Sequence, residues 1–534
     1  MRLRLLKIER SAAGGGLFDG CEIWFGRELD GKSNEPLAPV CLIGPNGSGK
    51  SQFLQLIAEI FQAAWHEHAP REERRSANEQ VLFDLAYMMT PDGADKPETV
   101  RLVRTMKGKK VGPIELLRGE DEVLKAGMPD FGKYLPSMVI GYTSGDNETL
   151  SLPFLSSRSG YADDVARAAL GDKPDKSILD NRLMLIDYAT NLEVLFSNLM
   201  LGSNHVRGEI LRHAGLDDLA SCRCVVRLAH SVVPKAPKTQ AAKSKRKGIQ
   251  LTAELEEIID RLKSIATCWS VEDKTETYTF DFFITEATRE AFGYYWPEGA
   301  FALYKSLHKL ALLNDLAIPK PTRERLKREI KDRKFASRPP QPQQEQMVFA
   351  FEEVKFWLED RSAAAVDYVS LSDGEHQQAL VLGAYAMVQD TNAVFLLDEP
   401  ESHFNPIWRV KFFQRLLDMT GARGNQDVLL TTHAPFVPSD MPREQVMIFS
   451  RNVDTGKINV AAPNIETFGA TFDRILETCF NIRPQNSYIA EKEIEKLLGS
   501  ENLADVEAGF HELGPSTGKA VLADHLRKLK KKLD

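Results

Sequence analysis

The sequence predicts an α/β fold, and two observations carry this prediction. Three short apolar runs have the composition of buried β-strands, and each ends at polar residues suited to binding phosphate, metal or water: Val40–Ile43, Ala393–Leu397 and Val428–Leu430. Helix-like apolar segments at 53–61 and 379–388 alternate with these runs. The 534 residues, 43% of them hydrophobic, are enough to bury a large core, and the length suggests two to four domains.

The first run leads into a glycine-rich segment that matches the P-loop pattern at every fixed position, Gly44-Pro45-Asn46-Gly47-Ser48-Gly49-Lys50-Ser51. Small residues let successive backbone N–H groups turn inward around phosphate oxygens. The Lys50 ammonium neutralises their charge, and the Ser51 hydroxyl can ligate Mg²⁺. A strand before the segment and a helix after it favour this interpretation over an ordinary glycine turn. We therefore expect a nucleoside triphosphate to bind at Asn46, Gly47, Ser48, Gly49, Lys50 and Ser51.

The second and third runs end at further reactive side chains. Asp398 and Glu399 follow the second run, where one carboxylate can reach Mg²⁺ and the next can orient an attacking water. His433 follows the third run; a histidine there is often only a satisfied polar residue, but its position after the acidic pair favours a functional role. We expect Asp398 to bind metal, together with Ser51, and Glu399 and His433 to be catalytic.

A fourth element precedes the acidic strand, in the segment Leu371-Ser372-Asp373-Gly374-Glu375-His376-Gln377. Ser372 is placed to cap the helix that follows, so the first backbone amides of that helix are available to an anion. By contrast, the segment Gly514–Ala520 is one residue short of a P-loop and lacks the terminal hydroxyl. We expect it to be a loop before the last helix.

Along the chain, the four elements are the P-loop, the segment around Ser372, the strand that ends at Asp398 and the strand before His433. In this order they resemble the ABC-type ATPases, and within them the soluble SMC and OLD-like branch. The fold implied is an ABC-type P-loop ATPase head split by a largely helical insertion, with ATP and Mg²⁺ as cofactors. The resemblance implies that Lys50 and Ser51 hold phosphate and Mg²⁺, that Asp398 completes the metal shell, that Glu399 activates water and that His433 senses the γ-phosphate. It also implies that Ser372 and Gly374 close over the nucleotide of a second protomer, and that Glu401–Pro406 is the D-loop between the two sites.

Two positions depart from the family pattern. The signature reads LSDGE, so the Asp373 carboxylate stands where a second glycine is usual and would repel a γ-phosphate unless it turns away. The Q-loop should follow a strand, and Met138–Glu148 is the best match, yet it contains no glutamine. Ser144 or Asn147 could replace it, or the segment could be a plain turn.

Composition limits the possible compartments and partners. The formal net charge of −8 argues against indiscriminate coating of nucleic acid, although local basic patches could still bind it. The six cysteines show no paired metal spacing, and the alternating pattern of residues 1–10 is that of a strand and not of a signal peptide. No apolar helical stretch is long enough to span a bilayer. We expect reduced thiols, a cytoplasmic location and no membrane contact.

Motif spacing predicts four segments. These are an N-terminal half of the ATPase head at 1–154, a helical insertion or lid at 155–346, a C-terminal half of the head at 347–460 and a C-terminal helical segment at 461–534. Strands are expected at 81–87 and 100–104, and helices at 183–201 and 301–316. The 4,3 apolar spacing from Leu251 to Ile265 spans about two heptads, too few for a stable coiled-coil arm.

Two basic stretches fall in the insertion. The first holds Lys235, Lys238, Lys243, Lys245, Arg246 and Lys247 without an intervening acid, and the second runs from 323 to 338. Each is either solvated surface or a contact for the phosphate backbone of a nucleic acid.

The resemblance extends most closely to ATPase subunits of prokaryotic anti-phage defence systems, such as PtuA of Septu or restriction-associated ATPases. It implies a homodimer or higher homo-oligomer that controls an effector. Because the sequence has no TOPRIM-like or HNH-like nuclease motif, we expect the effector to be a separate protein, and we expect that protein to be a nuclease. The alternatives are a DNA repair or chromosome-maintenance ATPase, a transporter's detached nucleotide-binding subunit and a scaffold that binds ATP without hydrolysing it.

Overall fold

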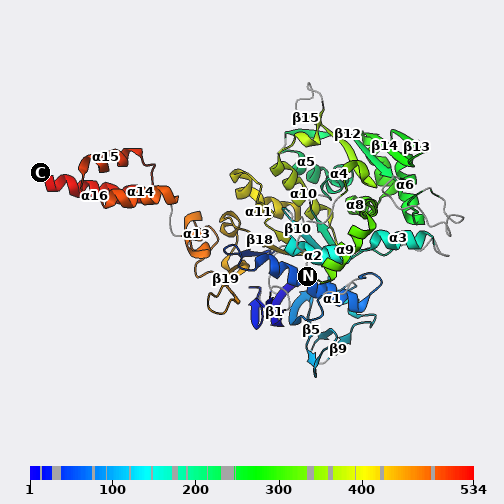
Figure 1. Cartoon of the computed structure of the whole chain (residues 1–534), viewed down its shortest axis with the longest axis horizontal. Coiled ribbons are helices and arrows are strands. Elements are labelled where there is room, and N and C mark those ends of the chain that lie inside the picture. Colours follow the sequence, from blue (N-terminus) through cyan, green and yellow to red (C-terminus); the bar gives the residue numbers. More distant parts are fainter. Residues whose placement is uncertain are drawn as a thin grey trace.

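The computed structural model describes all residues except 12–14, 27–37, 75–77, 92, 95, 120–121, 146–147, 171–177, 188–189, 213–214, 230–245, 247, 333–341, 359–364, 391, 421–425, 483–486 and 534. The predicted α/β fold class is confirmed. A parallel sheet, with helices packed on it, is interrupted in sequence by a large insertion (Figure 1).

The central sheet has seven strands in the order β11-β10-β17-β18-β3-β19-β20. Adjacent strands in this sheet are parallel, except that β19 and β20 are antiparallel. Helices or a second sheet cover both of its faces, so its inner strands are buried at every residue and are almost entirely apolar. The strands are β3 (Val40–Ile43), β10 (Val139–Thr143), β11 (Leu183–Ile186), β17 (Val394–Asp398), β18 (Asp427–Thr431), β19 (Val446–Arg451) and β20 (Ile458–Ala461).

Helix α1 (Lys50–His68) lies between the central sheet and a six-stranded antiparallel sheet, with one apolar core containing residues of all three. The antiparallel order is β2-β1-β4-β5-β8-β9. The strands expected at 81–87 and 100–104 are confirmed as β4 and β5, which pair with each other. Its strands are β1 (Arg2–Arg10), β2 (Cys21–Trp24), β4 (Leu82–Met89), β5 (Glu98–Arg104), β8 (Glu115–Arg118) and β9 (Glu122–Lys125). A small hairpin joins β5 to β8, formed by β6 (Met106–Lys107) and β7 (Lys110–Val111).

The opposite face of the central sheet is covered by helices of the C-terminal half. A second core joins the sheet to α10 (Asp373–Met387), α11 (Pro406–Thr420), α12 (Phe436–Ser439) and α13 (Phe472–Phe480). Alternate residues of each strand point into the two cores, as in β3, where Leu42 belongs to the first and Ile43 to the second.

The insertion has its own core and contains more β-structure than the sequence analysis predicted. Its five-stranded sheet has the order β13-β14-β12-β15-β16. The strands are β12 (Leu216–Arg227), β13 (Cys268–Glu272), β14 (Thr277–Phe283), β15 (Phe349–Leu358) and β16 (Val366–Asp367). The helices of this part are α3 (Tyr161–Ala169), α4 (Asn191–Leu201), α5 (Asn204–Leu211), α6 (Ala253–Ile265), α7 (Glu286–Tyr295), α8 (Ala300–Ala311) and α9 (Lys320–Asp332). The preceding helix, α2 (Glu148–Arg158), packs into the core around α1.

Two expectations about this region need correction. β15 lies after residue 346 but pairs with β12, so the segment assigned to the C-terminal half of the head begins inside the sheet of the insertion. The helix expected over 183–201 is a buried strand, β11, followed by α4. Short apolar runs fit a buried strand and a buried helix equally well, which explains the second error.

The 4,3 spacing near residue 260 corresponds to the single 13-residue helix α6, too short for a coiled-coil arm as predicted, and not to the short helical hairpin or lid that the spacing also suggested. Its apolar face, including Leu255, Ile258 and Leu262, packs into the core of the insertion. It is therefore an internal helix and not the start of an extended arm.

The C-terminal helices α14 (Tyr488–Leu498), α15 (Leu503–Glu512) and α16 (Thr517–Leu533) form a unit with a small core of Leu497, Val506, Leu522 and Leu529. In Figure 1 this unit extends away from the rest of the molecule, beyond α13. Gly514, Pro515 and Ser516 precede α16 in a loop, as expected, but residues 517–520, expected to belong to the same loop, form the first turn of α16. Among the helices of the described residues, none combines the length and apolar character needed to cross a membrane.

Candidate functional site

The P-loop connects the carboxyl end of β3 to the first turn of α1. Gly49 caps the helix with a φ of 92°, and Gly47 has a φ of 76° with open space where a Cβ would lie. Both angles are in the left-handed region that favours glycine. The buried Ser48 hydroxyl has no hydrogen-bond partner in the structure, and the Lys50 ammonium folds back onto the carbonyl oxygens of Gly44 (2.9 Å) and Pro45 (3.2 Å). This arrangement provides donors for an anion and fits a bound phosphate chain.

The strand order places the other reactive residues beside this loop. β18 lies directly between β3 and β17, so the residues at their carboxyl ends share one edge of the sheet. The Ser51 hydroxyl donates to Oδ1 of Asp398 at 3.1 Å, and the Thr431 hydroxyl donates to the same oxygen at 2.6 Å. Burial raises the pKa of Asp398, and the hydrogen bonds from Thr431 and Ser51 oppose that shift.

This pair of oxygen ligands suits Mg²⁺. A hydroxyl and a carboxylate are hard donors, and Mg²⁺ is typically held by one or two such protein groups together with phosphate oxygens and water. Among the described residues no group of three or more His, Cys, Asp or Glu side chains forms a self-sufficient metal cage. Ser51 and Asp398 therefore fit a cation that arrives with a nucleotide.

Glu399 and His433 meet at the same edge. Nε2 of His433 lies 3.1 Å from Oε1 of Glu399, and both side chains are partly open to solvent. The hydrogen bond from His433 lowers the pKa of Glu399. The backbone of Glu399 is left-handed with a φ of 49°, an unusual conformation for a non-glycine residue, and its N–H donates to Thr431 Oγ1 at 2.9 Å. The turn thus directs the carboxylate away from the metal-side oxygens and toward His433.

Lys50 is buried among these groups. Burial lowers its pKa to about 8, although the nearby Glu399 and Asp398 carboxylates act in the opposite direction. The site therefore carries a cation beside two carboxylates at an edge open to solvent.

The turn after Glu399 contains polar contacts that the sequence analysis missed. The buried Glu401 carboxylate accepts a hydrogen bond from Thr432, and burial raises its pKa to about 7. The buried Gln377 side chain of α10 accepts from the His403 N–H at 3.0 Å and donates to Ser402 Oγ at 3.3 Å. The sequence shows two threonines, Thr431 and Thr432, directly before His433, and these could have indicated the contacts. Only the strand order shows that Thr431 binds the Asp398 carboxylate and Thr432 the Glu401 carboxylate.

Ser372 and Gly374 lie at the start of α10. Ser372 caps this helix as predicted, in a reciprocal capping box with Glu375. Ser372 and Asp373 are exposed, and no hydrogen bond or ion pair within the described chain joins Ser372 or Gly374 to the P-loop. The chain thus gathers the P-loop, Asp398, Glu399 and His433 at one place and leaves the helix start of α10 facing outward.

The segment expected to be the Q-loop follows β10, which pairs with β17 in a register that sets Thr143 opposite Asp398. Ser144 therefore follows a strand whose end lies at the metal side of the site. Asn147, the other possible substitute for a glutamine, lies outside the described residues.

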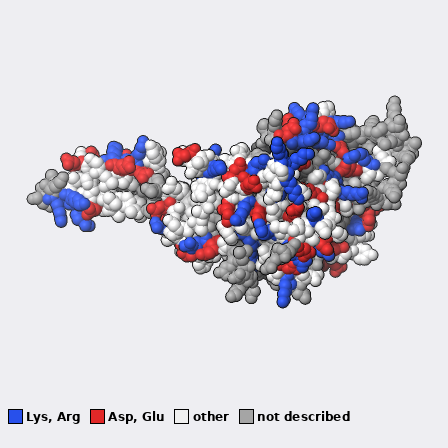
Figure 2. Space-filling view, turned by 90° about the horizontal axis from the view of Figure 1, so that it is seen from below, with Lys and Arg blue, Asp and Glu red and all other residues white. Residues whose placement is uncertain are grey.

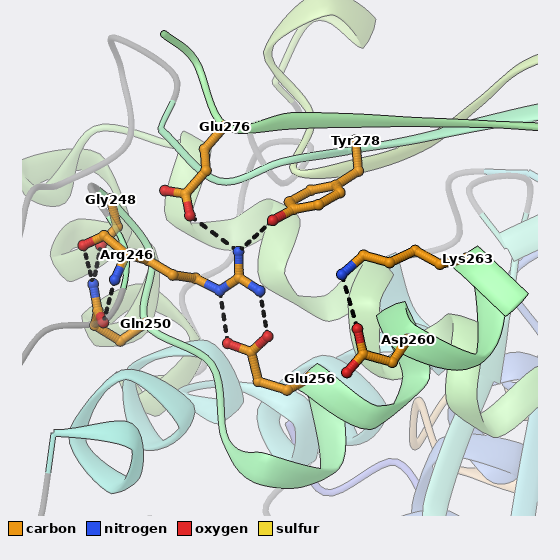
Figure 3. Close-up of polar contacts among 8 residues, drawn as sticks. All are labelled: Arg246, Gly248, Gln250, Glu256, Asp260, Lys263, Glu276 and Tyr278. Carbon is orange, nitrogen blue, oxygen red and sulfur yellow. Dashed lines mark hydrogen bonds and ion pairs between the residues drawn. The ribbon is translucent and has the colours of Figure 1, made fainter. Parts of the chain in front are cut away.

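The first basic stretch is only partly visible. Of its members the structure describes Arg246; Lys235, Lys238, Lys243, Lys245 and Lys247 fall outside the described residues. Figure 3 shows the Arg246 guanidinium between Glu256, Glu276 and Tyr278. Its Nε donates to Glu256 at 2.6 Å, and Nη1 donates to Glu276 at 3.0 Å and to Tyr278 at 3.1 Å. Arg246 is therefore a largely buried ion-pair residue, which corrects both alternatives expected of it, solvated surface and a phosphate contact.

The second basic stretch contains both cations held in ion pairs and cations exposed to solvent. On α9, Arg323 and Lys327 pair with Asp163 of α3, whereas Arg325, Arg328 and Lys331 are exposed. Figure 2 shows basic and acidic side chains interspersed over one face of the molecule. Nucleic-acid contact thus stays a prediction that depends on the exposed members of α9 and on residues outside the described part.

Comparison with known proteins gives a family match and similarities to solved structures, among them two SMC heads. Residues 238–440 match a family described as "AAA domain, putative AbiEii toxin, Type IV TA system", a range that contains β17, β18 and the start of α10 but not the P-loop. The SMC head domain from Thermotoga maritima is 10% identical with a TM-score of 0.33, over 87% of this chain and all of the other. An SMC head bound to the C-winged helix domain of ScpA is 10% identical with a TM-score of 0.31, over 86% of this chain and 97% of the other.

Proposed function

We propose that this protein is an ATPase of the ABC type that binds ATP with Mg²⁺ and hydrolyses it. The observation that carries the proposal is the single edge of the central sheet where the P-loop, the Ser51–Asp398 contact of 3.1 Å and the Glu399–His433 contact of 3.1 Å meet. A phosphate cradle, a metal-side carboxylate and a second carboxylate aimed elsewhere are the parts that phosphoryl transfer to water requires.

Each residue then has a separate task. The P-loop from Asn46 to Ser51 binds the phosphates, through its backbone N–H groups and the Lys50 ammonium. Ser51 and Asp398 hold Mg²⁺, which neutralises charge on the phosphate oxygens when bound. Glu399 orients and deprotonates the attacking water, and His433 holds the Glu399 carboxylate and reaches the γ-phosphate.

Ser372 and Gly374 act on a second protomer in this proposal. They start a helix whose first two residues after Leu371, Ser372 and Asp373, are exposed, and among the described residues no hydrogen bond joins Ser372 or Gly374 to the P-loop of their own chain. An exposed helix N-terminus suits the phosphates of a nucleotide held by another copy. ATP would therefore bind between two chains and stabilise a homodimer.

At the cellular level we propose an ATPase subunit of an anti-phage defence complex, with its effector on another chain. The match to a family described by a putative toxin of a Type IV TA system supports this role. A nuclease, reverse transcriptase or methyltransferase gene beside this one would strengthen it. A neighbourhood of repair or chromosome-segregation genes would favour chromosome maintenance instead.

The direct test is phosphate release by the purified full-length chain with ATP and Mg²⁺, measured over a range of protein concentrations. The proposal expects turnover that EDTA stops and that rises more steeply than linearly with protein, because two chains complete each site. Absence of ATP binding and of turnover would overturn it.

A further inference from the structure

The turn between β17 and α11, residues 399–405, contacts three other elements of the same chain. The next inference rests on the proposed ATPase function and concerns how the start of α10 is connected to Glu399 and His433. The start of α10 faces outward, and Glu399 and His433 lie at the proposed catalytic edge of the central sheet. The 399–405 turn lies between them.

Gln377 joins α10 to this turn. Its side chain is 6% exposed and bonds two consecutive residues, with Oε1 accepting from the His403 N–H and Nε2 donating to Ser402 Oγ. The helix approaches closely here, since a Cβ on Gly374 would lie 2.9 Å from the His403 carbonyl oxygen. The first turn of α10 therefore cannot shift without the turn at 402–403.

Glu401 joins the same turn to β18. Glu401 is 3% exposed and one carboxylate oxygen accepts from Thr432, while the other oxygen has no hydrogen-bond partner among the residues that the structure describes. Thr432 stands between Thr431, which holds Asp398 and the Glu399 N–H, and His433. The backbone of the turn is fixed from a third side, because the Arg409 guanidinium of α11 donates to the carbonyl oxygens of Ser402 (2.6 Å) and Phe404 (2.9 Å).

We propose that Gln377 and Glu401 are positioning residues that connect the start of α10 to the catalytic edge of the same chain. Gln377 carries a displacement of Ser372 and Gly374 to the 402–403 turn, and Glu401 carries it to the Thr431–His433 end of β18. Packed, hydrogen-bonded elements shift together between discrete arrangements, which makes such a connection physically reasonable. Engagement of α10 by the nucleotide of a second chain would then set the Glu399–His433 geometry of its own chain.

α10 offers a matched control one residue away. Gln378 is as buried as Gln377, at 3% exposed, but within the described part of the chain its Oε1 has no hydrogen-bond partner and its side chain makes no bond to the turn. Gln377→Leu and Gln378→Leu thus remove the same chemical group from the same helix. Only the first removes the connection.

The experiment measures three quantities for the full chain: the Kd for ATP at low protein concentration, ATP-dependent association in a Glu399→Gln background, and kcat. We expect Gln377→Leu to lower kcat about ten-fold, with the ATP Kd and association changed less than about two-fold. Gln378→Leu should match the parent in all three quantities. Glu401→Leu should lower kcat similarly, and Glu401→Gln, which keeps an acceptor for Thr432, should restore it.

Each outcome has a separate meaning. Equal kcat for Gln377→Leu and Gln378→Leu in an otherwise active protein would overturn the connection and leave the ATPase proposal standing. A loss of ATP affinity and of melting temperature in step with kcat would show that Gln377 only maintains the fold, which also overturns it. A parent protein that neither binds nor hydrolyses ATP would overturn the ATPase proposal itself.

Discussion

The Ser51 hydroxyl lies 3.1 Å from Oδ1 of Asp398, although 347 positions separate the two residues in the chain. β3 and β17 carry them to the same edge of the central sheet, with β18 between the strands. Thr431 at the end of β18 binds the same Asp398 oxygen at 2.6 Å. The oxygen cluster proposed to hold Mg²⁺ is therefore assembled from three segments by strand order.

Lys50→Ala and Glu399→Gln should fail in different ways. Removing the ammonium deletes the charge beside the phosphates, so the Kd for ATP should rise at least about thirty-fold. Removing the base leaves the cradle intact, so ATP should still bind while kcat falls roughly 10² to 10⁴-fold. Equilibrium binding of a fluorescent ATP analogue and phosphate release measure the two effects. A Glu399→Gln protein that hydrolyses ATP at the parent rate would refute the assignment of the base.

Thr431→Val should weaken the metal side of the site. The substitution keeps the volume but removes the hydroxyl that orients Asp398 and accepts the Glu399 N–H. Loss of such a supporting bond typically costs roughly ten-fold to a hundred-fold in metal affinity or activity. We expect the Mg²⁺ concentration at half-maximal turnover to rise by that factor. Thr431→Ser, which retains the hydroxyl, is the control, and an unchanged Mg²⁺ dependence in Thr431→Val would contradict the role.

Ser372→Arg should block ATP-dependent association. The exposed start of α10 would present a bulky side chain to the second chain, so the dimer dissociation constant should rise at least about ten-fold. Binding of ATP to the single chain should not change, because in the described part of the chain Ser372 hydrogen-bonds to Glu375 and not to the P-loop. Sedimentation with and without ATP, in a Glu399→Gln background, measures the difference. Equal assembly would show that this segment lies outside the interface.

Arg246→Ala should destabilise the insertion and leave nucleic-acid binding unchanged. The substitution leaves Glu256 and Glu276 without the guanidinium they share, and breaking such a largely buried pair costs roughly 2 to 4 kcal/mol. Urea unfolding measures the loss, with the exposed Arg325→Ala as control. If the parent binds DNA, the slope of log affinity against log salt should be the same in Arg246→Ala. A flatter slope would return Arg246 to the phosphate-binding surface.

The sequence alone determined the parts whose chemistry is local. The P-loop, the acidic pair after β17 and the capping serine of α10 are continuous segments, and the backbone geometry that they need is encoded in glycine placement, apolar runs and a capping side chain. Spacing also showed that α6 is too short for an arm. These features depend on neighbours within a few residues, so the amino-acid sequence alone is enough to recognise them.

Only the tertiary structure decided which distant segments meet. It placed β18 between β3 and β17, gave Thr431 to Asp398 and Thr432 to Glu401, and paired β12 with β15 across the boundary expected at residue 346. It also turned Arg246 from a presumed surface cation into the partner of two carboxylates. Apolar periodicity states that a strand is buried but not which strand lies beside it, because the pairing energy comes from contacts between residues far apart in the chain.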